Sequence, residues 1–334
     1  MVAAQNNASR FYLLDLSRGL AAIGIVIFHL SGNSKPLNAL YAFVDFFFVL
    51  SGFVLYRQCP KTFNYFKLKI FMTKRIKRLA PKAWIVIASS YFIYFIFKSL
   101  HLVEPEKELT VNFRTFVFGL MFLQFIIPSS ANLIVPMWSL SVEIFMNLIY
   151  ALIGASKRHI ILLGLFSFTT LSISLYIGTP INATSGWIAL IRGIYGFSCG
   201  LVTKMVYDNN ISISPKLSVT SIFIVILNFT LISISSNFLI FFAPSAALLI
   251  LLISKIEIRN RSLKLLCSLS GNFSYGIYLW HFPVIYFVDI FLKTTYFSRT
   301  FYTFKVLELS LTLTLSIIMT KISSMILKEK VPHN

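Results

Sequence analysis

A series of long apolar runs recurs along the whole of this chain and constrains its fold more than any other feature. The runs fall at about 12–32, 37–56, 81–100, 113–128, 133–154, 160–178, 186–206, 217–235, 238–254, 273–292 and 303–326. A run of about 18 apolar residues is long enough to cross the hydrocarbon part of a bilayer as a helix. Because a membrane helix satisfies its backbone polar groups internally, the sequence predicts an all-α integral membrane protein.

Composition excludes a soluble enzyme and indicates what the charges do. Hydrophobic residues make up 57% of the chain and charged residues only 12%, against about 25% charged in soluble domains. The net charge of +19 would suggest nucleic acid in a soluble domain. Here most basic residues lie between apolar runs, where they are typical of cytoplasmic loops that face anionic lipid. We therefore expect membrane lipid, and no nucleic acid, as a partner.

The basic clusters also predict the topology. They lie at 61–82, 157–158, 204–216, 255–264 and 328–330, and basic loops stay on the cytoplasmic side. Placing all of them inside requires that either 113–128 or 128–136 does not cross. We therefore predict a polytopic bundle of about ten transmembrane helices plus a re-entrant segment, with both termini cytoplasmic. We expect one membrane domain over 1–334, with its core motifs in 12–290 and no appended soluble domain.

Ionisable side chains inside such runs are costly, so each is a functional candidate. Arg18 and His29 are eleven residues apart in the first run, which places them on one helix face roughly 16 Å apart. A neutral imidazole can accept a proton near neutral pH, so His29 is a candidate general base. From this residue alone, a histidine that merely bonds a neighbouring helix is an equally good interpretation.

Acidic residues occur in two other runs. Glu143 lies inside an apolar helix and should face the protein interior, where a cation such as Arg192 could pair with it; Arg192 could instead bind a substrate. Asp45 opens the second run and is a functional candidate for the same reason. Ser51 and Gly52, later in that run, are more typical of close helix packing.

Further candidates lie elsewhere in the chain. Arg75 and Arg78 are three residues apart and can point the same way, as a phosphate clamp requires, although a basic run often serves topology alone. Trp138 is a site candidate or an interfacial anchor. His281 is a structural or a catalytic histidine. The three cysteines fit no metal spacing, so we predict neither a metal nor a disulfide.

Five motifs, in chain order, resemble the acyltransferase 3 family of bacterial membrane O-acyltransferases. They are Arg18 with His29; Phe47, Phe48, Ser51, Gly52 and Phe53; Arg75 and Arg78 with Pro81; Trp138 with Glu143; and Tyr275, Tyr278, Trp280 and His281. Each motif is weak alone, but the five in order extend over most of the chain.

The resemblance implies transfer of an acetyl or related acyl group from cytoplasmic acetyl-CoA to a sugar hydroxyl. The acceptor would be a cell-surface or lipid-linked glycan, such as O-antigen, capsule or exopolysaccharide, at the bacterial inner (cytoplasmic) membrane. His29 takes the place of the family's catalytic histidine and Arg18 that of its associated arginine. Arg75 and Arg78 take the place of the pair associated with the acyl-CoA donor.

A mechanism follows as a hypothesis. The pair Arg75 and Arg78 holds the CoA phosphates, the pantetheine arm runs beside Arg18, and His29 takes the proton of the sugar hydroxyl. The acidic residue that orients His29 is left open between Glu143, Asp45 and Asp15, and an acyl-histidine intermediate is a close variant. The residues expected to support the site or the substrate are Asp15, Ser51, Trp138, Arg192, Tyr278 and His281.

Two other functions stay open. A secondary transporter also has about ten spans with buried ionisable residues, although the halves of this chain show no evident repeat. A membrane acyltransferase with a lipid or peptide acceptor differs only in the acceptor. The oligomeric state is open.

Overall fold

The computed structural model describes residues 10–31, 34–102, 111–127, 132–209, 215–294 and 302–327. The described part of the chain contains helices and no strand, which confirms the all-α prediction. In chain order the elements are α1 (Tyr12–Ser31), η1 (Leu37–Ala42), α2 (Phe43–Leu55), α3 (Tyr65–Ser99), α5 (Phe113–Leu120), α6 (Met137–Ile153), α7 (Lys157–Tyr176), α8 (Gly186–Asp208), α9 (Pro215–Ile234), η3 (Ser236–Phe241), α10 (Phe242–Ile253), α11 (Arg261–Thr294) and α12 (Tyr302–Ile326).

Many of these helices are long and apolar enough to cross a membrane. Among the described residues seven segments meet this criterion: Tyr12–Ser31, Leu37–Leu55, Tyr65–Ser99, Lys157–Tyr176, Gly186–Asp208, Ser236–Ile253 and Glu308–Ile326. Two shorter apolar helices, Met137–Ile153 and Thr220–Ile234, add to them. The helix α11 has 34 residues, but polar residues such as Asn272 and His281 interrupt its apolar sequence. The chain is a multi-pass membrane protein, and the count of ten crossings stays a prediction.

Residues 113–127, the described part of the run 113–128, form no spanning helix. Its helix α5 has eight residues, or roughly 12 Å of length, far less than the bilayer core needs. Asn112 starts the helix by a reciprocal capping interaction with Thr115, and turns follow over 121–127. The N–H of Gly186 donates to the carbonyl of Phe125 (2.7 Å), which ties this segment to the start of α8. The structure thus supports the first of the two non-crossing alternatives; residues 128–131 of the second lie outside the described residues.

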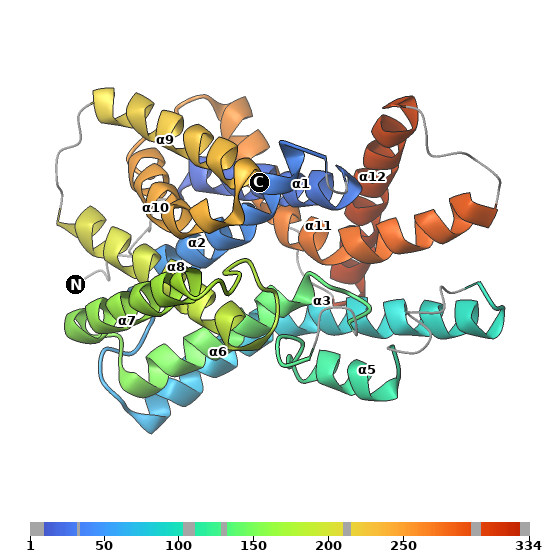
Figure 1. The fold of residues 1–334 in the computed structure, drawn as a ribbon, viewed down its shortest axis with the longest axis horizontal. Helices are drawn as coiled ribbons and strands as arrows, with labels where there is room; N and C mark the ends of the chain where they lie inside the picture. Colours follow the sequence, from blue (N-terminus) through green and yellow to red (C-terminus); the bar gives the residue numbers. More distant parts are fainter. Residues whose placement is uncertain are drawn as a thin grey trace, which may run out of the picture.

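Glycines allow a close contact between α2 and α8 (Figure 1). A Cβ atom on Gly52 would lie 2.2 Å from the carbonyl oxygen of Phe197, and one on Gly200 would lie 1.9 Å from that of Val49. Both contacts are with backbone, which cannot move aside as a side chain can. The packing interpretation of Gly52 is confirmed. The contact also holds α2, which carries Asp45 and Ser51, in a fixed position.

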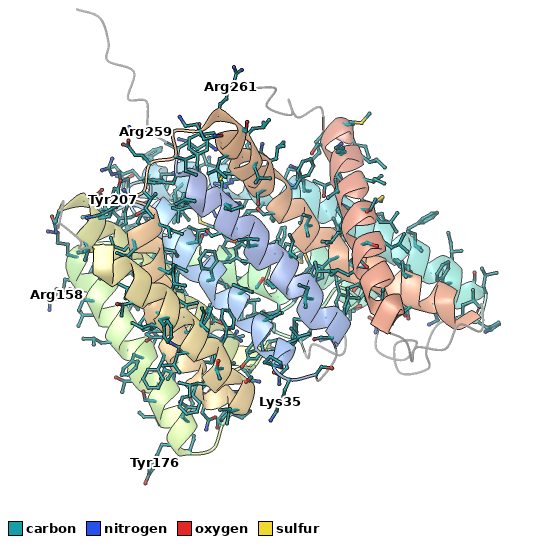
Figure 2. All side chains as sticks on the ribbon, turned by 90° about the horizontal axis from the view of Figure 1, so that it is seen from above. Lys35, Arg158, Tyr176, Tyr207, Arg259 and Arg261 are labelled. Carbon is teal, nitrogen blue, oxygen red and sulfur yellow. The ribbon has the colours of Figure 1, made fainter. Side chains whose placement is uncertain are left out.

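Contacts between loops place several helix ends on one face of the bundle. Arg57, after α2, pairs with Asp208 at the end of α8 (2.8 Å), and the N–H of Ala155 donates to the carbonyl of Pro60 (2.7 Å). In Figure 2, Arg259 and Arg261 lie at the opposite edge of the molecule from Tyr176. The end of α2, the end of α8 and the segment before α7 thus lie close together, whereas the basic cluster at 328–330 lies outside the described residues.

Candidate functional site

A cavity of about 430 Å³ lies between α1, α2, α3, α6 and α11. Its charged lining side chains are Arg18, Arg75, Arg78, Lys82 and Glu143. The apolar ones include Val44, Phe47, Phe48, Leu50, Val54, Leu55, Leu79 and Leu140. Its volume is in the range of small-molecule sites. The mixture of cations and apolar surface suits a ligand that is anionic at one end and flexible and apolar along its length.

An ion pair fixes one wall of this cavity. Arg75, on α3, donates to the Oε1 atom of Glu143, on α6, at 2.5 Å. Ser51, on α2, donates to the same oxygen at 2.9 Å. The prediction that Glu143 pairs with a cation is confirmed, but the cation is Arg75 and not Arg192. Ser51 joins two helices through its hydroxyl and also lines the cavity, which goes beyond simple packing.

The remaining arginines of the cavity are less constrained. Arg78 is exposed, and among the described residues it has no ion-pair partner. Arg18 is half-buried, and its guanidinium lies 3.8 Å from Asp15, which also pairs with Arg10. The structure therefore brings Arg18, Arg75 and Arg78 to one cavity, although Arg75 is already engaged. What the three bind stays a prediction.

A second buried ion pair lies away from this cavity. Arg192, on α8, donates from Nε and Nη2 to the two carboxylate oxygens of Asp45, on α2, at 2.7 and 2.6 Å. The guanidinium also faces the rings of Trp138 (5.4 Å) and Tyr41 (5.8 Å). None of these residues lines the cavity. In this structure both carboxylate oxygens of Asp45, one of the three candidates for orienting His29, accept from Arg192.

His29 and His281 lie together near the other end of α1. Their ring centroids are 5.2 Å apart, with 34° between the ring planes. His29 also contacts the rings of Phe28 (4.8 Å) and Phe282 (5.1 Å). His29 is half-buried and His281 fully buried. Their contact was not predicted, because nothing in the sequence relates the face of α1 to that of α11.

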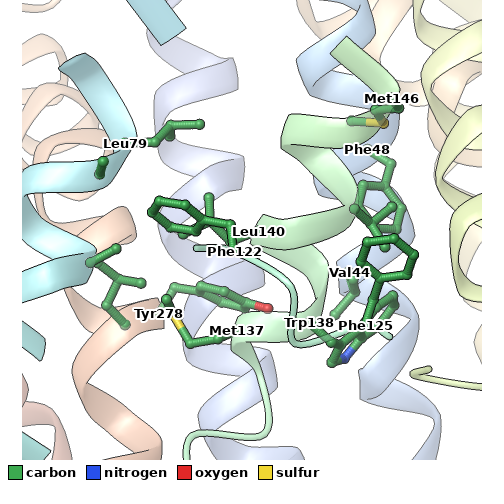
Figure 3. Packing of buried hydrophobic residues seen from close by; sticks show 14 of the residues in the cluster. Val44, Phe48, Leu79, Phe122, Phe125, Met137, Trp138, Leu140, Met146 and Tyr278 are labelled. Atoms are coloured by element: carbon green, nitrogen blue, oxygen red, sulfur yellow. The ribbon is translucent and has the colours of Figure 1, made fainter. Parts of the chain in front are cut away.

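A tyrosine, Tyr278, lines the cavity and also contacts the histidine pair. Tyr278 lines the cavity, and its ring lies 5.8 Å from that of His281 on the next turn of α11. Its hydroxyl is bonded to Ser139 (2.5 Å) and donates to the carbonyl of Pro136 (2.8 Å); Figure 3 shows it reaching toward α6. His29 is not among the lining residues. The cavity that contains Arg18 therefore does not extend to His29.

The carboxylates expected to orient His29 are all bonded elsewhere. Glu143 bonds Arg75, Asp45 bonds Arg192, and Asp15 bonds Arg10. Among the described residues, His29 has no hydrogen bond from its ring. Within the described residues, no carboxylate is therefore hydrogen-bonded to His29 as a triad would require.

Comparison with known proteins gives the family. A family model described as "Acyltransferase domain" matches residues 11–328, nearly the whole chain. The chain belongs to the acyltransferase 3 family. A Staphylococcus aureus (strain COL) protein named "Putative O-acetyltransferase" is 26% identical over 315 residues, which cover 82% of this chain and 50% of that protein. The chain thus spans about half the length of the curated relatives of this group.

A second relative matches a shorter part of the chain. "Protein 2 in picA locus" of Rhizobium radiobacter is 34% identical over 169 residues, 46% of this chain and 86% of that protein. No solved structure matches the chain.

In this acyltransferase 3 protein, several site residues escaped sequence reasoning. Lys82 lines the cavity one helical turn after Arg78, so the spacing of i and i+4 on a helix was a usable signal. Asn272 is a polar residue at the start of an apolar run, a weaker signal. Ser139 lines the cavity and bonds Tyr278, but the sequence carries no signal for it, because its role depends on which helix lies opposite.

Proposed function

We propose that this chain transfers an acyl group, normally acetyl, from a cytoplasmic acyl-CoA to a hydroxyl of a cell-envelope glycan. Membership of the acyltransferase 3 family and the name of the Staphylococcus aureus relatives support the reaction class. The observation that carries the donor assignment is the cation-lined cavity within the helix bundle. Arginine forks suit phosphate, and the apolar wall suits a pantetheine arm.

The donor would bind with its phosphates at the cationic end of the cavity. Arg78 and Arg18 are the better candidates for phosphate contact, because Arg75 is held by Glu143. The Nε atom of Arg75 nevertheless has no hydrogen-bond partner among the described residues, which leaves a donor for the ligand. The acyl end would then point along the apolar wall toward Tyr278.

Transfer requires the thioester to meet His29. Because Tyr278 lines the cavity and contacts His281, we expect its side chain to move aside when the donor binds. Such a gate keeps water away from the thioester until both substrates are present. His29 would then remove the proton from the sugar hydroxyl as its oxygen attacks the thioester carbonyl. The carbon–sulfur bond breaks, and the CoA thiolate takes the proton back from His29.

The acceptor, a surface or lipid-linked sugar, would approach from the side opposite the basic clusters. His29 lies at the end of α1 that leads to the 34–42 segment, on the outer side in the topology with cytoplasmic termini at the bacterial inner membrane. Neither a lipid or peptide acceptor nor an acyl-histidine intermediate has an observation in its favour.

The test is acetate released by mild base from purified surface glycan. A strain without the gene should lose the acetate, and the wild-type gene should restore it. His29→Ala should fail to restore it, because general-base help contributes about 10²- to 10⁴-fold. His101→Ala, at an exposed histidine, is the matched control and should restore it fully. Unchanged glycan acetate in the deletion strain, or solute flux without acetyl transfer, would reject the proposal in favour of transport or another acceptor.

A further inference from the structure

A general base needs its second ring nitrogen held in a defined state. In a neutral imidazole one nitrogen carries the proton and the other accepts, and the bond made by the protonated nitrogen selects the tautomer. If His29 takes the sugar proton, an acceptor must therefore hold its other ring nitrogen, which carries N–H. The three carboxylates expected in this role are bonded to arginines instead.

His281 has an unused acceptor next to His29. Its Nδ1 atom lies 2.7 Å from the carbonyl oxygen of Tyr278. A carbonyl only accepts, so Nδ1 carries the proton and Nε2 presents a lone pair. Nε2 is buried and has no hydrogen-bond partner among the described residues. Most buried polar atoms in proteins have a partner, so this lone pair requires an explanation.

The neighbouring ring is the natural partner. The centroids of His29 and His281 are 5.2 Å apart, so a rotation of the His29 ring can bring two nitrogens within hydrogen-bond distance. Catalytic hydrogen bonds are often unaligned before the substrate binds and form in the complex. Phe282, packed on His29 from the same helix as His281, limits the other positions of the ring.

We propose that Nε2 of His281 accepts a hydrogen bond from His29 in the substrate complex and thereby sets its tautomer. The inference rests on the proposed function, because it assigns the orienting partner of the same general base. His281 is then a positioning residue: it acts through His29 and exchanges no proton. The order along the chain of bonds is the carbonyl of Tyr278, the ring of His281, the ring of His29 and the sugar hydroxyl.

Two amide substitutions separate this role from a structural one. In His281→Asn the side-chain amide can still donate to the carbonyl of Tyr278 but has no acceptor at the place of Nε2. In His281→Gln the longer side chain places an acceptor near that position and gives up the bond to Tyr278. We expect His281→Asn to lower kcat about tenfold to a hundredfold, as loss of an orienting partner does, with KM for acetyl-CoA unchanged. His281→Gln should retain clearly more activity.

A second pair keeps the ring shape in case the amides prevent insertion. At position 281, 3-pyridylalanine supplies a ring nitrogen with a lone pair and no N–H, and phenylalanine supplies the ring alone. The pyridyl variant should keep most of the activity and His281→Phe should lose it. In a His29→Ala background neither pair should differ, because the partner is gone.

The outcomes separate the inference from the proposed function. If wild-type protein transfers no acetyl group, the proposed function fails. If wild-type protein is active and His281→Asn equals or exceeds His281→Gln, the bond to Tyr278 is what matters and the inference is overturned. Full activity of His281→Phe would overturn it as well.

Discussion

At the scale of single residues, the buried charges divide into two pairs with different surroundings. Arg75 and Glu143 form part of the cavity wall, whereas Asp45 and Arg192 lie buried between α2 and α8, with side chains 5% and 3% exposed. When both side chains of an ion pair are buried, removing one of them leaves the other charge buried without a partner, which strongly destabilises the fold. The first pair is therefore placed to meet a ligand, and the second to fix the position of α2.

The two arginines of the basic motif should respond differently to substitution. Arg78→Ala should raise KM for acetyl-CoA about tenfold to a hundredfold, since a hydrogen bond to a charged group contributes about 1.5–3 kcal/mol. Lys77→Ala, a neighbouring exposed cation that does not line the cavity, is the control and should leave KM unchanged. Steady-state kinetics on membranes of equal protein content measure both. Equal effects of the two substitutions on KM would indicate that the basic segment around Arg78 serves membrane topology alone.

Arg75→Ala should lower the stability of the protein more than it weakens binding of the acyl-CoA donor. It leaves the carboxylate of Glu143 without its cation, which typically costs about 3–5 kcal/mol for a buried pair. We expect a lower midpoint of thermal unfolding in detergent and less inserted protein. Arg75→Lys keeps a charge but loses the planar fork, so it should recover part of the stability. An Arg75→Ala protein as stable as wild type would contradict the ion-pair assignment.

The sequence predicted which charged residues matter better than it predicted their partners. Arg18 and Glu143 are predicted because an ionisable residue in an apolar run is costly wherever it points, and Arg75 because its spacing from Arg78 lets both point the same way. The partner of Glu143 depends on the rotation and neighbours of α6, which a single sequence does not contain. For the same reason the suggestion that Arg192 pairs with Glu143 is wrong: its partner is Asp45. The contact of His29 with His281 was not predicted either.

At the scale of helices, the contact of α2 with α8 positions Ser51 at the cavity. It depends on glycines, because a Cβ atom on Gly200 would lie 1.9 Å from the carbonyl of Val49. Small residues of this kind let membrane helices approach to backbone contact.

Gly200→Ala should therefore separate the two helices and destabilise the protein by about 1–3 kcal/mol. The thermal unfolding midpoint in detergent measures this, and acetyl transfer should fall with it. Gly164→Ala is the control: it introduces the same methyl group on α7, where the nearest atom is the side-chain Cβ of Ser198 at 3.2 Å. It should cost much less. Equal unfolding midpoints for the two variants would show that α2 and α8 can move apart at little cost in stability.

The helices themselves were largely predictable, with one informative exception. Long apolar runs gave most of the helices and identified 113–128 as a candidate for a segment that does not cross. The polar content of α11 could not be interpreted in the same way. Asn272, Tyr278 and His281 interrupt its apolar sequence. Only the packed structure shows that the first two line the cavity and that His281 contacts Tyr278.

At the scale of the whole molecule, the helix ends form two faces. Arg259, exposed before α11, and Tyr176, 91% exposed at the end of α7, lie at opposite edges (Figure 2). From the asymmetry of basic residues we propose that the face with Arg259 is cytoplasmic. The cationic cavity would then load its donor from inside the cell.

Thiol labelling tests this orientation. Arg259→Cys should react with a membrane-impermeant maleimide only in inside-out vesicles, and Tyr176→Cys only in intact spheroplasts. Cys199 and Cys267 are replaced by alanine in both. Cys59, in the loop after α2, can stay, because burial raises the pKa of its thiol to about 12 and the thiolate is the reactive form. Labelling of both positions from one side would contradict the topology.

The most direct measurement follows acetyl transfer across the membrane. Inside-out vesicles that carry the lipid-linked glycan receive acetyl-CoA labelled in its acetyl group, so that the donor reaches only the cytoplasmic face. We predict base-labile label on the glycan with wild-type and His101→Ala protein, and at least about 10² times less with His29→Ala. Equal labelling by wild-type and His29→Ala protein, or none by wild type, would contradict the proposed chemistry.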